Sequence, residues 1–229
     1  MKTAIRTVPC RLATVSAAAL MTASTALAQD SDDAAWVEIT DWRAAAATDG
    51  WSADRALDSD VMGSGGEEIG ELEDIIVGPD GRIESVIVEG GGFIDIGDVH
   101  AAVPWSEVIV IGPERVEVDV AEEDLDDAER YKQMDDMPAK PMNFRVRELM
   151  GDFVTADGVG YGAVDDVIFD AEGEIVSVVV YPSAAYRRRP VAVPYNASAY
   201  DPYGPYYALP YTTVELDELP PYEAEDEGE

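Results

Sequence analysis

Short hydrophobic runs of the kind found in β-strands recur along most of the chain. Glu71–Val77 and Ile83–Glu89 are rich in Val and Ile, and alternation with charged residues follows at Val116, Val118 and Val120. Alternation with a period of two predicts a strand with one face in solvent. Val108–Ile111 has no alternation, so this run is predicted to be buried on both sides or enclosed in a barrel. The pattern predicts a mainly β protein.

Turn and helix signals separate these runs. Gly78-Pro79-Asp80-Gly81 stands between the first two, and proline at its second position with a glycine at its end favours a tight hairpin. Helical patterns are few. Asp41–Ala47 is predicted to be one helix, and Glu122–Gln133 a second, because its acids come first and its bases late, as the helix dipole prefers.

The chain aligned with itself at an offset of 92 residues shows an internal duplication. Residues 55–88 align with residues 147–180 without a gap, and the pairs that define the repeat are Gly70 and Gly162, Asp74 and Asp166, and Gly81 and Gly173. Later blocks match in the same order. We therefore expect two homologous units at 55–131 and 147–223, with a short helical linker at 132–146. Short strands at this spacing predict that each unit closes into a small β-barrel, because closure removes exposed sheet edges.

The N-terminal segment differs from the rest in charge. Residues 1–28 hold no acid, three basic residues, an Ala-rich apolar stretch and a final Ala26-Leu27-Ala28. These features are typical of a cleavable secretory signal, so we predict a signal peptide cleaved after Ala28 and a periplasmic or secreted protein. An amphipathic N-terminal helix is the alternative. The apolar run is too short to span a bilayer, so no stable membrane insertion is expected after cleavage.

Acidic residues dominate the composition. The chain has 15 Lys+Arg against 48 Asp+Glu, a formal net charge of −33, while 47% of its residues are hydrophobic, enough to build a core. Nucleic acid is not expected as a partner, because its binding needs a basic surface. Adaptation to salty surroundings is the simpler interpretation of this charge, and weak divalent-cation binding is the alternative. Residues 29–54 are predicted to be a partly helical extension, and residues 224–229 an acidic tail.

The order of the motifs resembles that of the PRC-barrel domain family. Each unit shows an opening leucine motif, a Gly-x-x-x-Asp motif and an Ile-x-Ser-Val-x-Val strand, at Leu57…Val61, Gly70…Asp74 and Ile83…Val88 and at Leu149…Phe153, Gly162…Asp166 and Ile175…Val180. The resemblance implies a small β-barrel in each unit and a role in binding proteins rather than in catalysis. It supplies no catalytic residue and no cofactor.

Few residues offer reactive chemistry. His100 is the only histidine, and no G-x-S-x-G motif accompanies it, so a structural role is expected. Asp74 and Asp166 occupy equivalent places in the two copies, which favours a role in the fold, as acceptors of backbone N–H groups. No metal site is predicted. A hydrolase that uses carboxylates alone remains an alternative and requires an Asp or Glu with a raised pKa in a cleft.

The stretch from Tyr181 to Tyr211 holds most of the 11 tyrosines and an Arg-Arg-Arg cluster. Tyr and Arg often anchor protein interfaces. The candidate partner-binding residues are therefore Tyr181, Tyr186, Arg187, Arg188, Arg189, Tyr195, Tyr200 and Tyr203. The alternative is a loop that packs on its own unit. We expect an exported, non-enzymatic binding or scaffold protein whose partner is another envelope or secreted protein. A carboxylate-dependent hydrolase or a weak cation binder are the other possibilities.

Overall fold

The computed structural model describes residues 36–39, 42, 50–90, 99–112, 115–121, 129–131, 143–186 and 189–223. The predicted signal peptide, most of the Asp41–Ala47 helix, most of the linker and the acidic tail lie outside these residues. Among the described residues, no helix has the length and apolar character needed to cross a membrane.

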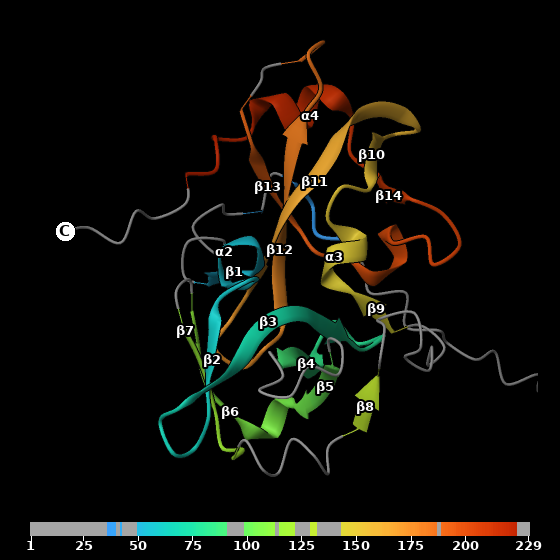
Figure 1. Cartoon of the computed structure of the whole chain (residues 1–229). Helices are drawn as coiled ribbons and strands as arrows, with labels where there is room; N and C mark the ends of the chain where they lie inside the picture. Colours follow the sequence, from blue (N-terminus) through green and yellow to red (C-terminus); the bar gives the residue numbers. More distant parts are fainter. Residues whose placement is uncertain are drawn as a thin grey trace, which may run out of the picture. The chain divides into compact units, whose positions relative to one another are not determined.

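The first repeat builds an eight-stranded sheet with the order β6-β7-β2-β3-β4-β5-β8, in which β9 also pairs with β3 (Figure 1). Its long hairpin is β3 and β4. The elements are α2 (Ala53–Ala56), β2 (Asp60–Met62), β3 (Glu68–Val77), β4 (Ile83–Gly90), β5 (Val99–Pro104), η1 (Trp105–Glu107), β6 (Val108–Gly112), β7 (Arg115–Val118) and β8 (Glu129–Tyr131).

The second repeat builds a six-stranded sheet with the order β13-β12-β11-β10-β14, in which β1 also pairs with β11. Its long hairpin is β11 and β12, and α4 begins with a capping box of Thr212 and Glu215. The remaining elements of the two sheets are β1 (Trp51–Ser52), β9 (Phe144–Arg145), α3 (Val146–Leu149), β10 (Phe153–Ala156), β11 (Val159–Phe169), β12 (Ile175–Pro182), β13 (Val191–Pro194), η4 (Ala197–Ala199), β14 (Tyr206–Leu209) and α4 (Thr213–Glu218).

The mainly β prediction is confirmed, but the two closed barrels are not. In the part of the chain that the structure describes, both sheets are open, and their edge strands are β6 and β8 in the first sheet and β13 and β14 in the second. The strand that precedes each repeat pairs with the long hairpin of the other repeat, through β1 with β11 and β9 with β3. Each sheet is therefore completed by its neighbour in place of closing on itself.

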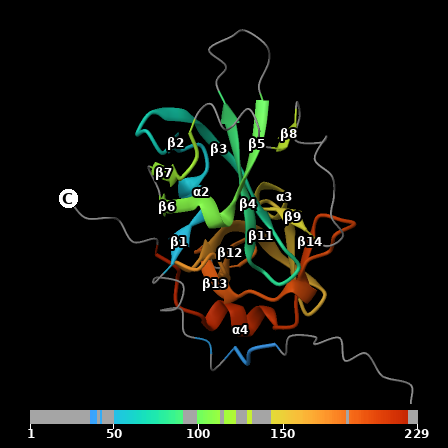
Figure 2. The ribbon, with the colours of Figure 1, turned by 90° about the horizontal axis from the view of Figure 1, so that it is seen from below.

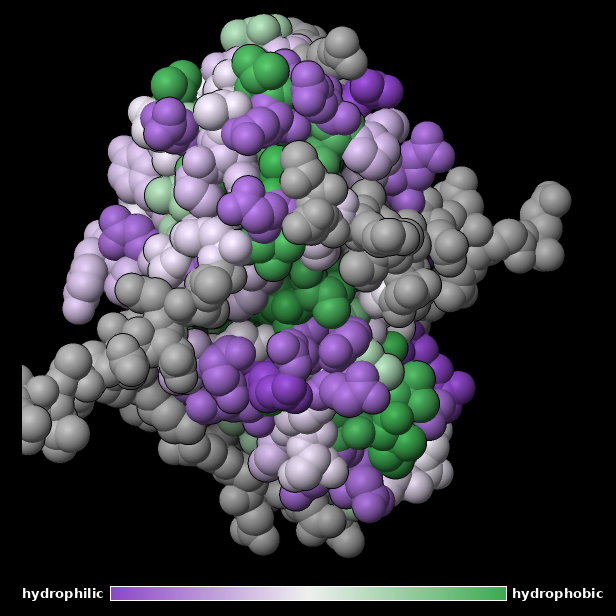
Figure 3. All heavy atoms as spheres, turned by 180° about the vertical axis from the view of Figure 1, so that it is seen from behind, coloured by the Kyte–Doolittle hydropathy of each residue, from purple (hydrophilic) through white to green (hydrophobic). Residues whose placement is uncertain are grey.

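Two local predictions are wrong. Glu129–Tyr131, within the expected Glu122–Gln133 helix, forms strand β8 against β5. Val108–Ile111 is not buried on both sides, because Ile109 and Val110 are 60% and 47% exposed. This run is the edge strand β6, and its register shifts between Val108 and Val110. Figure 3 shows hydrophobic side chains (green) gathered at the lower right, on the side where β6 lies. By contrast, the predicted alternation at Val116, Val118 and Val120 is confirmed, since all three are buried.

Equivalent residues of the two repeats are separated by 93 residues at β2 and β10 and by 92 residues at β3 and β11. Gly70 and Gly162, which are 92 residues apart, occupy the same position in β3 and β11. Their partners Val61 and Val154 are 93 residues apart, so the first repeat has one more residue between β2 and β3. The alignment without a gap is therefore wrong before Glu68, and Leu149, the last residue of α3, corresponds to Ala56, the last residue of α2.

The repeats meet where their long hairpins turn (Figure 2). The N–H of Ile83 donates to the carbonyl of Gly173 over 2.9 Å, and the N–H of Ile175 donates to the carbonyl of Gly81 over 2.9 Å. Between them, Arg82 and Glu174 form a β-bridge and an ion pair. Because each contact has a counterpart with the repeats exchanged, the two halves are related by an approximate two-fold axis.

Candidate functional site

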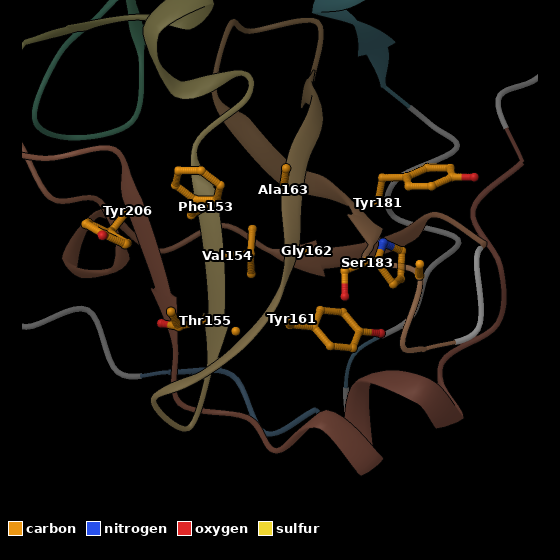
Figure 4. Close-up of a pocket in the computed structure, with 12 residues that line it drawn as sticks. Phe153, Val154, Thr155, Tyr161, Gly162, Ala163, Tyr181, Ser183 and Tyr206 are labelled. Carbon is orange, nitrogen blue, oxygen red and sulfur yellow. The ribbon is translucent and has the colours of Figure 1, made fainter.

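A groove of about 780 Å³ lies on the second repeat, over the outer face of β10, β11 and β12 (Figure 4). Four residues form one row across the sheet, because Tyr206 pairs with Phe153, Phe153 with Ala163, and Ala163 with Tyr181. Three of the four are aromatic and 45–60% exposed. The rings of Phe153 and Tyr206 lie side by side with centroids 6.1 Å apart. Exposed aromatic side chains that gather around a concavity mark binding surfaces.

Small residues on β11 form the floor of this groove. Gly162 and Ala163 lie between Phe153 on one side and Tyr181 on the other (Figure 4), and Gly160, which pairs with Thr155, also lines the groove. Gly162 is required by packing, because a Cβ there would lie 2.2 Å from the carbonyl oxygen of Tyr181. At Gly160 a Cβ would meet no described atom within 4 Å. The backbone therefore leaves open space over Gly160 that the fold itself does not need.

Polar groups are few in the groove. Among the described residues that line it, none is charged, and hydroxyls come from Thr155, Ser183 and the tyrosines. The hydroxyl of Tyr161 donates to Asp217 over 3.1 Å, and burial raises the pKa of Tyr161 well above its usual range. Such a lining suits binding by apolar contact and offers little for acid–base chemistry.

The candidate residues predicted from the sequence are distributed over three places. Tyr181 lines the groove. Tyr186 supports its floor, since its ring packs 4.9 Å from that of Tyr161 and its hydroxyl donates to the carbonyl of Gly160 over 3.1 Å. Arg189 is exposed and is not among the residues that line the groove, while Arg187 and Arg188 lie outside the described residues.

Three further candidates lie away from the groove lining. Tyr195 packs against Gly81 of the first repeat, so closely that a Cβ added to this glycine would lie 2.8 Å from the tyrosine ring. The ring of Tyr200 packs against that of Phe144 in β9, with the centroids 4.8 Å apart and the planes tilted by 37°. Tyr203 is almost fully exposed, in the loop before β14. The tyrosine-rich stretch therefore divides between the groove, the contact between repeats and solvent.

The buried aspartates connect the two repeats. Oδ1 of Asp74 accepts hydrogen bonds from the N–H of Ile75 (2.8 Å) and from the N–H of Arg147 in α3 (3.1 Å). Oδ1 of Asp166 accepts from the N–H of Val167 (2.7 Å) and from the N–H of Asp54 in α2 (2.9 Å). Each carboxylate thus caps the short helix that belongs to the other repeat.

Burial of these carboxyls raises the pKa of Asp74 and of Asp166 to about 6, against the lowering effect of their backbone hydrogen bonds. Burial and the nearby Glu148 and Asp201 raise the pKa of Asp152 to about 6 as well. None of these three lines the groove. In the described ranges, no group of three or more His, Cys, Asp or Glu side chains is arranged to hold a metal ion.

A model of the PRC-barrel domain matches the chain twice, at residues 52–125 and 144–214. These two matches cover more than half of the chain and coincide with the two repeats. The chain belongs to the PRC-barrel domain family. A comparison with curated proteins finds no significant match.

The first PRC-barrel repeat carries no aromatic row on the equivalent face. There Asp60 pairs with Glu71, Glu71 with Glu89, and Glu89 with His100, which is buried. Phe153 and Ala163 were not found from the sequence, because a single apolar residue within a strand does not reveal which face it occupies. Comparison of outward positions between the two copies, once their register is known, identifies both.

Proposed function

We propose that this PRC-barrel protein is an exported, non-enzymatic binding or scaffold module of the cell envelope, and that it holds a partner protein in the groove of its second repeat. The observation that carries the proposal is the row of Tyr206, Phe153, Ala163 and Tyr181 on an otherwise strongly acidic chain. Exposed aromatic residues cost solubility, and a cluster of them around a concavity is typical of an interaction site.

The placement of the acids supports a binding role over catalysis. A carboxylate hydrolase needs a raised-pKa carboxyl in its substrate cleft. Asp74 and Asp166 have raised pKa values, but both accept backbone hydrogen bonds between the repeats. The groove itself is lined by apolar and hydroxyl groups in the described part of the chain.

Export is supported by the sequence of residues 1–28. Fractionation of cells that produce the full chain tests this part of the proposal. We expect the protein in the periplasm or the medium, with Gln29 as its first residue by mass spectrometry. Protein that keeps Met1 and stays with the cytoplasm would contradict export.

A matched pair of glycine variants tests the groove. Gly160→Val fills the groove, and Gly112→Val places the same side chain in β6 of the first repeat, where a Cβ would meet nothing closer than 4.0 Å. We expect the partner captured from envelope extract by the wild-type protein to be lost with Gly160→Val and kept with Gly112→Val. Equal recovery with both variants would reject the groove as the binding site.

A further inference from the structure

The floor of the groove lies inside the sheet. β11 pairs with β10 on one side and with β12 on the other, through Phe153 with Ala163 and Ala163 with Tyr181. The carbonyl of Gly160 accepts the hydroxyl of Tyr186 in addition. A partner strand adds only at a sheet edge with free backbone groups, and the edges of this sheet are β13 and β14. A bound segment therefore receives little backbone hydrogen bonding from the floor.

The lining suits a segment that needs no such bonds. A polyproline II helix has a solvated backbone without internal hydrogen bonds, and aromatic-lined grooves bind it through its proline rings. Phe153, Tyr181 and Tyr206 supply exposed rings. Ala163 places only a methyl group between Phe153 and Tyr181, and Gly160, opposite Thr155 in the same groove, has no side chain. An α-helix is about 10–12 Å wide with its side chains. The strands that carry Phe153 and Tyr181 are only about 10 Å apart, so a helix would rest on the rings and leave the floor uncovered.

The acidic residues around the groove favour a ligand with positive charge. Asp157 and Asp165 are exposed beyond the two ends of the floor residues 160–163, and the whole chain carries −33. A basic segment is attracted by this field, and Lys or Arg side chains also bind the faces of exposed tyrosine rings. An acidic segment would be repelled.

We infer that the groove binds a proline-rich segment of a partner protein in the polyproline II conformation, with lysine or arginine beside the prolines. This inference rests on the proposed function and names the chemistry of the partner. The groove residues act by packing: Phe153 and Tyr206 contact one side of the segment, Tyr181 contacts the other, and Gly160 and Ala163 admit the proline rings.

A labelled peptide with two Pro-x-x-Pro units and flanking lysines tests the inference, by fluorescence anisotropy with the chain from Gln29 to Glu229. We expect binding that weakens at high salt, about tenfold or more weaker binding to Gly160→Val, and a change within about twofold for Gly112→Val. Thermal unfolding of both variants confirms that they fold. Three control peptides replace proline by alanine, replace lysine by glutamate, or form an amphipathic helix.

The control peptides decide between ligand classes. Equal binding of the alanine peptide, or tighter binding of the helical peptide, would overturn the polyproline II assignment. Equal binding of the glutamate peptide would overturn the charge assignment. If no proline-rich peptide binds while Gly160→Val still abolishes partner capture, the inference fails and the proposed function stands. If Gly160→Val leaves partner capture unchanged, the proposed function itself fails.

Discussion

The outer faces of the two sheets carry different side chains on the same backbone positions. Asp60, Glu71 and Glu89 form a charged row on the first repeat, whereas Phe153, Ala163 and Tyr181 form an apolar one on the second. The inner faces and the contact between repeats are alike. The difference shows that the fold depends on the core and the hairpin turns, which both copies keep, and that the outer face was free to change. We expect the charged face of one copy to favour solubility, and we propose that the apolar face of the other is a binding surface.

The largest expected effect concerns a position that both copies share. Gly173 has a φ of 79°, and a Cβ there would lie 2.7 Å from the ring of Trp105 in the other repeat. Gly173→Val should lower the free energy of unfolding by about 2–5 kcal/mol, because it combines left-handed backbone strain with a clash. Urea unfolding measures the loss. Gly158→Val is the control, with a φ of 73° but no described atom within 4 Å of its Cβ, and it should lose less. Equal losses would show that the contact between repeats does not require glycine.

The buried aspartates should give equal effects in the two repeats. Asp74→Ala and Asp166→Ala each leave two backbone N–H groups without their acceptor. Each variant should lose about 1–3 kcal/mol in urea unfolding. The exposed neighbour Asp165 serves as the control, and Asp165→Ala should change stability by no more than about 0.5 kcal/mol. A loss in only one repeat would break the two-fold relation inferred from the structure.

The same aspartates should make stability depend on pH. The pKa of Asp166 is about 6 in the folded protein and about 4 in an unfolded chain, so the folded state binds the proton more tightly. The free energy of unfolding should therefore rise by about 1 kcal/mol for this group as the pH falls from about 7 to about 5. Asp166→Asn should remove this part of the rise. Parallel curves for the variant and the wild type would contradict the raised pKa.

The smallest expected effect lies on the charged face. Glu71 has Asp60 and Glu89 as its cross-strand neighbours, and like charges in such pairs are destabilising. Glu71→Gln should therefore raise stability by about 0.2–1 kcal/mol, and the gain should shrink in high salt. Ala163→Gln, at the equivalent position in the second repeat, should show no such gain. If the gain in stability is the same at low and high salt, charge repulsion is not its cause.

Local patterns predicted much of this fold. The strands on either side of Gly81 and Gly173 could be predicted from runs of β-branched residues and from the turn glycines, because both signals lie within a few residues of the structure that they determine. The openness of the sheets and the exchange of β1 and β9 between repeats depend on contacts far apart in the sequence, so the closed barrels were not predicted correctly. Val108–Ile111 was assigned to the interior because hydrophobic runs at an edge strand resemble buried ones.

The candidate site was predicted in part for the same reason. Composition drew attention to Tyr181, which lines the groove. It also drew attention to Tyr195 and Tyr200, which pack against Gly81 and Phe144. Tyrosine content does not distinguish a ring in solvent from a ring between two sheets. Only the register of β10, β11 and β12 brings Phe153 and Ala163 beside Tyr181.

The reciprocal caps have a consequence for the order in which the chain matures. Asp74 leaves the ribosome before Arg147, the residue whose backbone N–H will donate a hydrogen bond to it. In the other pair, Asp54 leaves long before Asp166, the residue that will accept a hydrogen bond from its N–H. During synthesis the first half therefore has neither its capping acceptor nor β9, the strand that completes its sheet. We expect its carboxylate to stay hydrated until the second half emerges, so that final docking of the halves occurs only once the whole polypeptide has been made.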